Sequence, residues 1–175
     1  MRRVVLGPLN KLTRAIWNVV WLFFYRPSPV YFHFWRRFLL RCFGASICAR
    51  ALPYPSAKIW APWNLTMRDY SCLSHHVDCY CVDKVFLGER VTVSQYSFLC
   101  TAGHDYSDSA MPLITAPIQI EADAWVTADV FVGPGVTIGQ GAVVLARSTV
   151  VKNVPAWTVV GGNPCRNLRQ RVIRV

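Results

Sequence analysis

A six-residue repeat constrains the fold of this chain more than any other feature. Written in sixes from Ile120, the sequence reads IEADAW, VTADVF, VGPGVT, IGQGAV, VLARST and VVKNVP. Upstream, LGERVT and VSQYSF keep this form from Leu87, and the phase also fits Ile59, Leu65 and Val77. A period of six is neither the 3.6 of a helix nor the 2 of a flat strand. It is typical of a solenoid in which short strands end at regular turns.

The repeat also predicts which way the side chains point. An aliphatic residue opens each of the six units, and the fifth place always holds a small or β-branched residue. We expect the leading residues to face inward and the residues at the fifth place to fill the corners. The glycines at the second place, Gly88, Gly133 and Gly139, are interpreted as tight-turn residues. The chain is therefore predicted to form one mainly β domain with a continuous core.

The regular rhythm is predicted to break first in LCTAGHDY, residues 99–106. Leu99 and Ile120 are 21 residues apart, which is not a multiple of six. Between them, HDYSDSAMPLITAP contains Ser, Asp and two Pro residues, so residues 104–117 are predicted to form an extruded loop. His104 stands at the root of this loop. Its imidazole could accept a proton near neutral pH, although a histidine that only caps a turn would fit the same residues.

The N-terminal segment is basic and aromatic. The net charge is +10, and residues 1–50 hold nine Arg or Lys, no acidic residue and 11 of the 23 aromatic residues. Two amphipathic helices separated by RPSP are expected, and the second, near residues 34–43, should place Phe38, Leu39 and Cys42 opposite its arginines. These helices could cap the first coil or lie on an anionic membrane. The apolar stripe of the first helix consists of Leu12, Ile16, Val19 and Phe23.

Other features narrow the class of protein. Seven scattered cysteines without CxxC do not indicate a disulfide framework or a zinc finger, so mostly buried, reduced thiols are expected. His75 and His76 raise the three-histidine zinc site of gamma-class carbonic anhydrases, but only His104 follows them, and no metal is expected. No nucleic-acid recognition motif occurs. The apolar run 15–25 is short and no cleavage site follows MRR, so neither a membrane span nor secretion is expected.

Four motifs resemble those of a known family. GHDY, GPGVTIGQGAVVLARS, VPAWTVVGGNPCR and the leading FYRPSP…WRRFLLRCFGA are similar to hexapeptide-repeat acyltransferases, most closely the colanic-acid-type O-acetyltransferases of polysaccharide synthesis. The resemblance covers nearly the whole chain. It implies a left-handed parallel β-helix, three hexapeptides to each triangular coil, assembled as a homotrimer with sites between subunits. It also implies acetyl transfer from acetyl-CoA to a sugar hydroxyl by direct attack, with His104 as the general base.

The same resemblance implies a binding site for acetyl-CoA. Trp125 would lie near the pantetheine arm, the backbone N–H of Ala128 would face the thioester carbonyl, and Ala146 would contact the pantetheine amide through its backbone. Three basic residues would lie near the CoA phosphates: Lys152, Arg166 and Arg169.

For the acceptor, the resemblance is less direct. Asp78, Tyr80 and Asp105 could contact sugar hydroxyls, and Asp105 could instead orient His104. Cys81 stands where the family commonly has an asparagine, and Val151 replaces a threonine, so sugar specificity and one cofactor contact depart from the usual pattern.

The chain is therefore divided into three expected segments: a helical cap or membrane-proximal segment, 1–46; the β-helix, 47–164; and a basic tail, 165–175. We expect a cytoplasmic acetyltransferase, with peripheral contact to the inner face of the membrane through residues 1–46. The acceptor would be a lipid-linked or nucleotide-linked sugar. The alternatives are an acetyltransferase for another small hydroxyl acceptor, such as an antibiotic or free sugar, and a non-catalytic solenoid scaffold that binds a membrane or partner.

Overall fold

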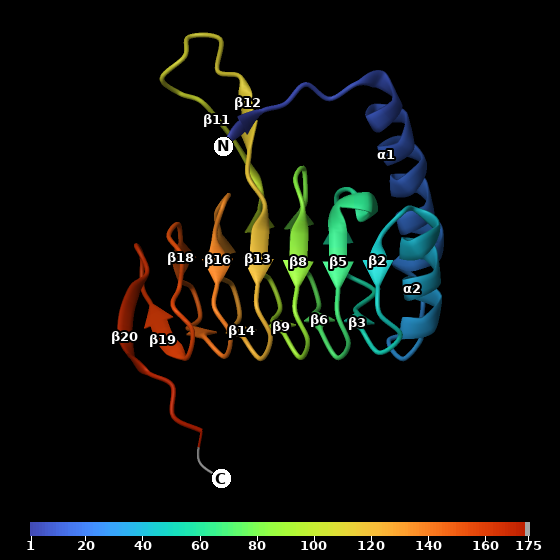
Figure 1. Ribbon diagram of the computed structural model, residues 1–175. Helices are drawn as coiled ribbons and strands as arrows, with labels where there is room; N and C mark the ends of the chain where they lie inside the picture. Colours follow the sequence, from blue (N-terminus) through green and yellow to red (C-terminus); the bar gives the residue numbers. More distant parts are fainter. Residues whose placement is uncertain (174–175) are drawn as a thin grey trace.

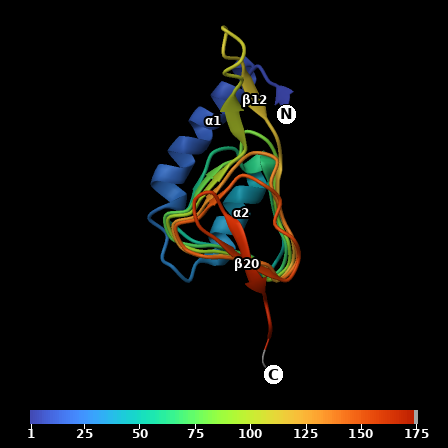
Figure 2. The same ribbon diagram turned by 90° about the vertical axis from the view of Figure 1, so that its left-hand side faces the viewer.

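The computed structural model describes residues 1–173, so the last two residues of the expected basic tail, 174–175, lie outside the described residues. Short parallel strands stack into a solenoid with three sides (Figure 1), and the view along its axis shows the three-sided outline (Figure 2). Two helices lie at one end of the stack and strand β20 at the other. The predicted fold class, a mainly β parallel helix with a helical N-terminal segment, is confirmed.

Each coil contributes one strand to each of three faces. The first face contains β2 (Ser46–Ile47), β5 (Leu65–Met67), β8 (Val85–Leu87), β13 (Ile118–Ile120) and β16 (Thr137–Ile138). The second contains β3 (Leu52–Pro53), β6 (Cys72–Leu73), β9 (Thr92–Val93), β14 (Trp125–Val126), β17 (Val143–Val144), β19 (Thr158–Gly161) and the antiparallel β20 (Arg166–Gln170). The third contains β4 (Lys58–Ile59), β7 (Asp78–Tyr80), β10 (Phe98–Cys100), β15 (Phe131–Val132) and β18 (Thr149–Val150). We name the turn from the second to the third face the second corner, and the passage to the next coil's first face the third corner.

The predicted inward positions form the core. The leading residues of the six regular units are buried: Ile120, Val126, Val132, Ile138, Val144 and Val150. The residues at the fifth place are buried as well: Ala124, Val130, Val136, Ala142, Ser148 and Val154. Because each coil covers the apolar edge of the next, all of these side chains except the polar Ser148 belong to one continuous hydrophobic cluster.

The early coils are longer than the repeat predicts. Parallel pairing aligns Ile59 with Cys79, 20 residues later, whereas Val126 aligns with Val144, 18 residues later. The two additional residues lie at the third corner, where η2 (Pro62–Asn64) forms a short 3-10 helix in the first of these coils. The six-residue rhythm is therefore broken at this corner before the chain reaches Leu99.

The predicted phase through Ile59, Leu65 and Val77 is consequently wrong. Leu65 and Met67 both point into the core, and Met67 is the residue that aligns with Ile47 of the preceding coil. Val77 is buried, but it precedes β7 at a corner rather than opening a unit. The sequence spacing alone could not separate a leading residue from an additional buried one.

Two of the three glycines at the second place, Gly88 and Gly139, serve close packing rather than turns. A Cβ on Gly88 would lie 2.6 Å from the backbone nitrogen of Ala122, and one on Gly139 would lie 2.5 Å from that of Ala156. Neither glycine has a positive φ. Side chains are excluded there because the neighbouring coil approaches the backbone.

The extruded segment is a β-hairpin rather than an irregular loop. Strand β11 (Ala102–His104) pairs antiparallel with β12 (Leu113–Thr115), and the N-terminal strand β1 (Arg2–Arg3) pairs antiparallel with the other edge of β12. The hairpin rises from the third corner between β10 and β13 (Figure 1). Residues 2–3 of the expected helical cap therefore belong to this small sheet.

The helices cover the first coil with aromatic side chains. Helix α1 (Pro8–Val20) continues into the π-helical turn η1 (Trp21–Tyr25), and α2 (His33–Cys42) follows the prolines. Trp17 is fully buried and its Nε1 donates to the Ile59 carbonyl at 2.6 Å, while Trp21 Nε1 donates to Ala57 at 2.9 Å. None of the helices within residues 1–173 is long and apolar enough to cross a membrane.

Two details of the N-terminal prediction are wrong. Arg36 was expected on the polar side of α2, but it is fully buried, and burial lowers the pKa of its guanidinium. Backbone carbonyls satisfy this cation, with Nε donating to Pro53 at 2.7 Å and Nη1 to Pro29 at 2.8 Å. Phe38 and Cys42, expected on the apolar side, are exposed. The thiols are also less buried than expected, because only three of the seven, Cys79, Cys81 and Cys100, are buried.

Candidate active site

His104 is the last residue of strand β11, where it pairs with Leu113 next to the hairpin turn, and it is exposed. Its Nδ1 lies 2.6 Å from the backbone carbonyl of Met111 across the hairpin. A carbonyl oxygen only accepts hydrogen bonds, so this contact requires the proton on Nδ1. In the neutral ring the lone pair is then on Nε2. His104 is thus held in the tautomer that can accept a proton at Nε2.

Asp105 does not orient this ring. Its Oδ1 accepts hydrogen bonds from the backbone N–H (3.1 Å) and the hydroxyl of Ser107, and its Oδ2 lies 3.8 Å from Arg3. The hydrogen bonds from Ser107 hold the pKa of Asp105 below its ordinary value, with Arg3 contributing in the same direction. The alternative role considered for Asp105, orientation of His104, is filled by the Met111 carbonyl.

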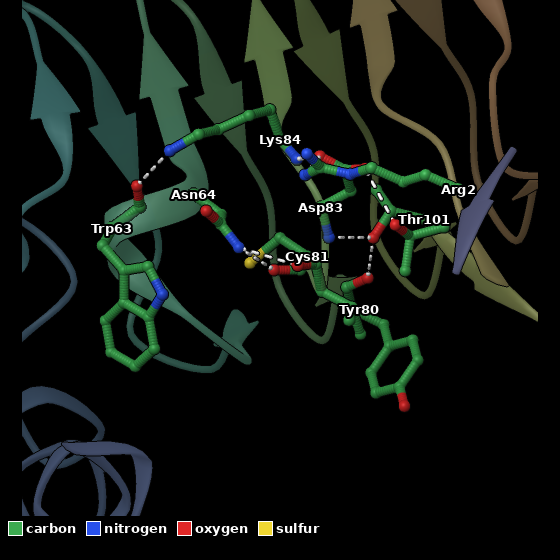
Figure 3. Close-up of polar contacts among 10 residues, drawn as sticks. Arg2, Trp63, Asn64, Tyr80, Cys81, Asp83, Lys84 and Thr101 are labelled. Carbon is green, nitrogen blue, oxygen red and sulfur yellow. Dashed lines mark hydrogen bonds and ion pairs between the residues drawn. The ribbon is translucent and has the colours of Figure 1, made fainter. Parts of the chain in front are cut away.

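The root of the hairpin is tied to the solenoid through Asp83 (Figure 3). This carboxylate is 5% exposed and accepts two hydrogen bonds from Arg2, at 3.2 and 3.0 Å. It also accepts from the Thr115 hydroxyl at 3.0 Å and from the backbone N–H of Lys84 at 2.8 Å. Strand β12, which pairs with the strand of His104, and strand β1 on its other edge are therefore both anchored to one buried charge, because each carries a partner of Asp83.

A second connection links the hairpin to β7. The Thr101 hydroxyl accepts from the backbone N–H of Asp83 at 2.9 Å and donates to the Tyr80 carbonyl at 2.9 Å (Figure 3). Sequence analysis missed Asp83, Thr101 and the pairing of β1 with the hairpin. The two additional residues at the third corner of the early coils were the sequence signal that this corner is specialised. The incorrect six-residue phase through Ile59, Leu65 and Val77 concealed that signal.

Two of the three residues expected to contact the acceptor, Asp78 and Tyr80, lie on the third face, whereas Asp105 lies in the hairpin turn. Asp78 is partly exposed, 3.8 Å from Lys58, and burial raises the pKa of its carboxyl while Lys58 opposes that rise. The Tyr80 ring contacts Trp60 and Phe98, with centroids 5.4 and 6.3 Å away. A carboxylate and an aromatic ring are thus presented on β7, which leads into the third corner.

Cys81, at the position where the family commonly has an asparagine, is not accessible to a ligand from solvent. Cys81 is fully buried, with its Sγ 3.3 Å from both the backbone nitrogen and the carbonyl of Ala61. The side-chain amide of Asn64 donates to the carbonyls of Cys81 and Val82, at 3.0 and 2.9 Å (Figure 3). Cys81 therefore serves packing at the third corner.

The expected cofactor residues fall into separate groups. Ala128 and Ala146 line one groove of about 450 Å³ at the second corner, together with Tyr96. Lys152 and Arg166 line another cavity of about 410 Å³ at the third corner near the end of the stack.

The remaining two lie outside these cavities. Trp125 is half exposed on the second face, and its Nε1 donates to the Ser94 hydroxyl at 2.9 Å. Arg169 is exposed on β20, paired with Val159.

One chain does not bring His104 to the groove at Ala128. His104 rises from the third corner, whereas Ala128 and Ala146 lie at the second corner, so the third face separates them. Lys152 shares the corner of His104, two coils further along the solenoid. Within residues 1–173, no group of three or more His, Cys, Asp or Glu side chains is arranged to hold a metal ion.

Comparison with known proteins identifies the class of protein that has this fold. No protein-family model matches the chain. A protein of Escherichia coli strain K12, WcaF, assigned as an acetyltransferase of colanic acid biosynthesis, is 41% identical over 163 residues, which are 93% of this chain and 90% of that protein.

Solved structures agree with this match. A hexapeptide-repeat-containing acetyltransferase from Vibrio cholerae is 27% identical with a TM-score of 0.84, covering 95% of both chains. The same enzyme complexed with acetyl coenzyme A gives 26% identity and a TM-score of 0.81, over 95% of this chain and 91% of that one. A maltose O-acetyltransferase from Clostridium difficile 630 shares the fold, with a TM-score of 0.84 at 21% identity, over 95% and 90% of the two chains.

The fold is therefore that of the hexapeptide-repeat acetyltransferases. Within that class, the chain belongs to the colanic acid biosynthesis acetyltransferase family, as its identity over nearly the whole length shows. The resemblance inferred from GHDY and the C-terminal motif is confirmed, and the protein is an acyltransferase.

Proposed function

We propose that this protein transfers an acetyl group from acetyl-CoA to a sugar hydroxyl during exopolysaccharide synthesis, with His104 as the general base. The observation that carries the proposal is the hydrogen bond from His104 Nδ1 to the Met111 carbonyl, which leaves Nε2 as the proton acceptor. His104 takes the proton of the hydroxyl as its oxygen attacks the thioester carbonyl. His104 then returns this proton to the departing CoA thiolate. No acyl-enzyme is required.

The donor would bind along the solenoid. The Ala128 N–H would donate to the developing oxyanion, a contribution of about 3 kcal/mol at comparable sites. Ala146 would bind the pantetheine amide, and Trp125 would cover the arm. Lys152, Arg166 and Arg169 would bind the phosphates through charge-assisted hydrogen bonds. The likeness to the Vibrio cholerae enzyme complexed with acetyl coenzyme A supports this assignment.

The active unit would be a homotrimer in the cytoplasm. Its support is the separation of His104 from the Ala128 groove within one chain, because general base and oxyanion donor must act on one reacting centre. A neighbouring copy would place its groove against this hairpin, so each site would lie between two subunits.

The acceptor would lie on the third face below His104, against Asp78, Tyr80 and Asp105. A carboxylate beside an aromatic ring suits a sugar, whose hydroxyls need acceptors and whose C–H faces pack on apolar surface. The acceptor would be lipid-linked or nucleotide-linked, and residues 1–46 would contact the inner face of the membrane.

The proposal is tested by measuring acetyl-CoA-dependent thiol release against a panel of nucleotide-linked, lipid-linked and free sugars. We expect release that requires one acceptor class. Lys152→Ala with Arg166→Ala should raise the KM for acetyl-CoA, more strongly at low salt, whereas the exposed Arg50→Ala serves as the matched control. Acetylation of only a non-sugar acceptor would contradict the sugar assignment. Vesicle binding with neither cofactor binding nor turnover would favour the scaffold alternative.

A further inference from the structure

Helix α1 has two apolar faces, and only one of them covers the solenoid. The side of Trp17 and Trp21 packs on the first coil, as their hydrogen bonds to Ile59 and Ala57 show. Arg14 lies on the same side, with its guanidinium 3.9 Å from the centre of the Trp60 ring. The other side carries an apolar stripe in which each residue is 52–76% exposed: Leu9, Leu12, Ile16, Val19 and Phe23.

The exposed stripe extends over η1, the following turn and α2. Here too, large apolar side chains face outward, and each is 45–89% exposed: Phe24, Tyr31, Phe32, Phe34 and Phe38. Between η1 and α2, an apolar hollow of about 300 Å³ is lined by Phe24, Phe32 and Phe34, with Phe23 and Trp35. Contiguous exposed apolar surface of this kind marks an interaction site rather than a tolerated exception.

The charge around this surface is of one sign. No acidic residue precedes Asp69 in the sequence. Lys11 and Arg26 are exposed beside the stripe. Arg41 donates to a backbone carbonyl, that of Ile47, which leaves its charge uncompensated. A second copy docking through the same surface would bring like charges together, whereas an anionic lipid leaflet is complementary.

We propose that the outward surface formed by residues 9–38 is a membrane-docking surface for the anionic lipid headgroups and upper acyl region of a bilayer. Apolar side chains would enter the interface while Lys11 and Arg26 remain at headgroup level. This inference rests on the proposed function, whose membrane contact it defines. Vesicle binding tests the docking surface, and turnover tests the acetyltransferase activity. Capping and docking use opposite sides of α1, so the two roles considered for this segment are compatible.

The test is sedimentation of the protein with vesicles of phosphatidylcholine, alone or mixed with phosphatidylglycerol as the anionic lipid. We expect binding to the anionic vesicles that falls with added salt. Ile16→Ser with Phe23→Ser should lower the partition coefficient at least tenfold, since each substitution removes a large apolar side chain from the interface. Lys11→Glu with Arg26→Glu should lower it on anionic vesicles only.

The matched control is Val172→Ser with Ile173→Ser, which removes two exposed aliphatic side chains outside the docking surface. It should leave vesicle binding unchanged. Sedimentation equilibrium and circular dichroism on each variant separate lipid docking from self-association and misfolding. Equal binding of the Ile16/Phe23 variant and wild type would overturn the proposal, and so would loss of oligomeric mass in that variant with vesicle binding retained. Turnover on a soluble acceptor, measured alongside, should be unaffected by the docking variants.

Discussion

Replacement of Asp83 should loosen the hairpin that carries His104. The buried carboxylate accepts from the Thr115 hydroxyl and the Lys84 N–H, and hydrogen bonds to a charged group contribute about 1.5–3 kcal/mol each. Arg2 is 70% exposed, so solvent screening limits its ion pair to about 0.5–1 kcal/mol. Asp83→Ala should therefore lower the free energy of unfolding by about 3–6 kcal/mol, Thr115→Val by about 1.5–3 kcal/mol, and Arg2→Ala by less than about 1 kcal/mol.

Urea denaturation measures these values, and amide hydrogen exchange locates the effect. The Ala116 N–H donates to Thr101 at the hairpin root, and the Val4 N–H donates to Leu113 opposite His104, so the two amides report on both ends of the small sheet. In Asp83→Ala they should exchange faster than amides of β17, which is distant from the hairpin. An effect of Arg2→Ala as large as that of Asp83→Ala would refute the reasoning, because it would assign the stabilisation to the exposed pair. Unchanged exchange at the hairpin in Asp83→Ala would refute it as well.

Three further predictions concern stability, each measured by chemical denaturation. Tyr25→Phe should raise the free energy of unfolding by about 1 kcal/mol, because the fully buried hydroxyl has no hydrogen-bond partner among the described residues; a loss of stability would contradict this. Asp78→Asn should be more stable than wild type at neutral pH, because burial raises the folded-state pKa of Asp78 and so disfavours its charged form. The difference in the free energy of unfolding should shrink as the pH falls through that pKa. A difference that does not change with pH would contradict this explanation. Gly139→Ala should lower the free energy of unfolding by about 2 kcal/mol or more, because its Cβ would lie 2.5 Å from the Ala156 nitrogen. Gly133→Ala should be nearly neutral, because the contacts of its Cβ would be 3.4 Å long. Equal effects of the two substitutions would refute the packing argument.

The repeat predicted the core in the regular coils and failed in the longer ones. From Ile120 onward, every leading position and every fifth position is buried as expected. In the early coils the third corner holds two additional residues, and Leu65 happened to fit the six-residue phase although Met67 occupies the aligned position. Both side chains are apolar and buried, so composition gave no means of distinguishing them.

The candidate site was predictable to the extent that it depends on local sequence. His104 was selected because it interrupts the repeat within a motif; it is exposed at the end of β11, and its role as general base stays a prediction. The partners Met111 and Asp83 were not predictable, because their contacts depend on hairpin register and on pairing with β1, 81 residues before Asp83. Helical periodicity likewise identified the stripe of Ile16 and Phe23 without indicating that it faces away from the solenoid.

The central claim is that His104 removes the proton from the acceptor hydroxyl. The most direct measurement is acceptor-dependent thiol release from acetyl-CoA by wild type, His104→Ala and His75→Asn, with acetyl-CoA affinity measured separately by calorimetry. His75 is the control because it is a second histidine that does not belong to the hairpin. Its Nδ1 lies 2.9 Å from the Ser56 hydroxyl. We expect kcat to fall about 10²–10⁴-fold in His104→Ala, with cofactor affinity retained and His75→Asn near wild type. Turnover by His104→Ala at the wild-type rate would contradict it.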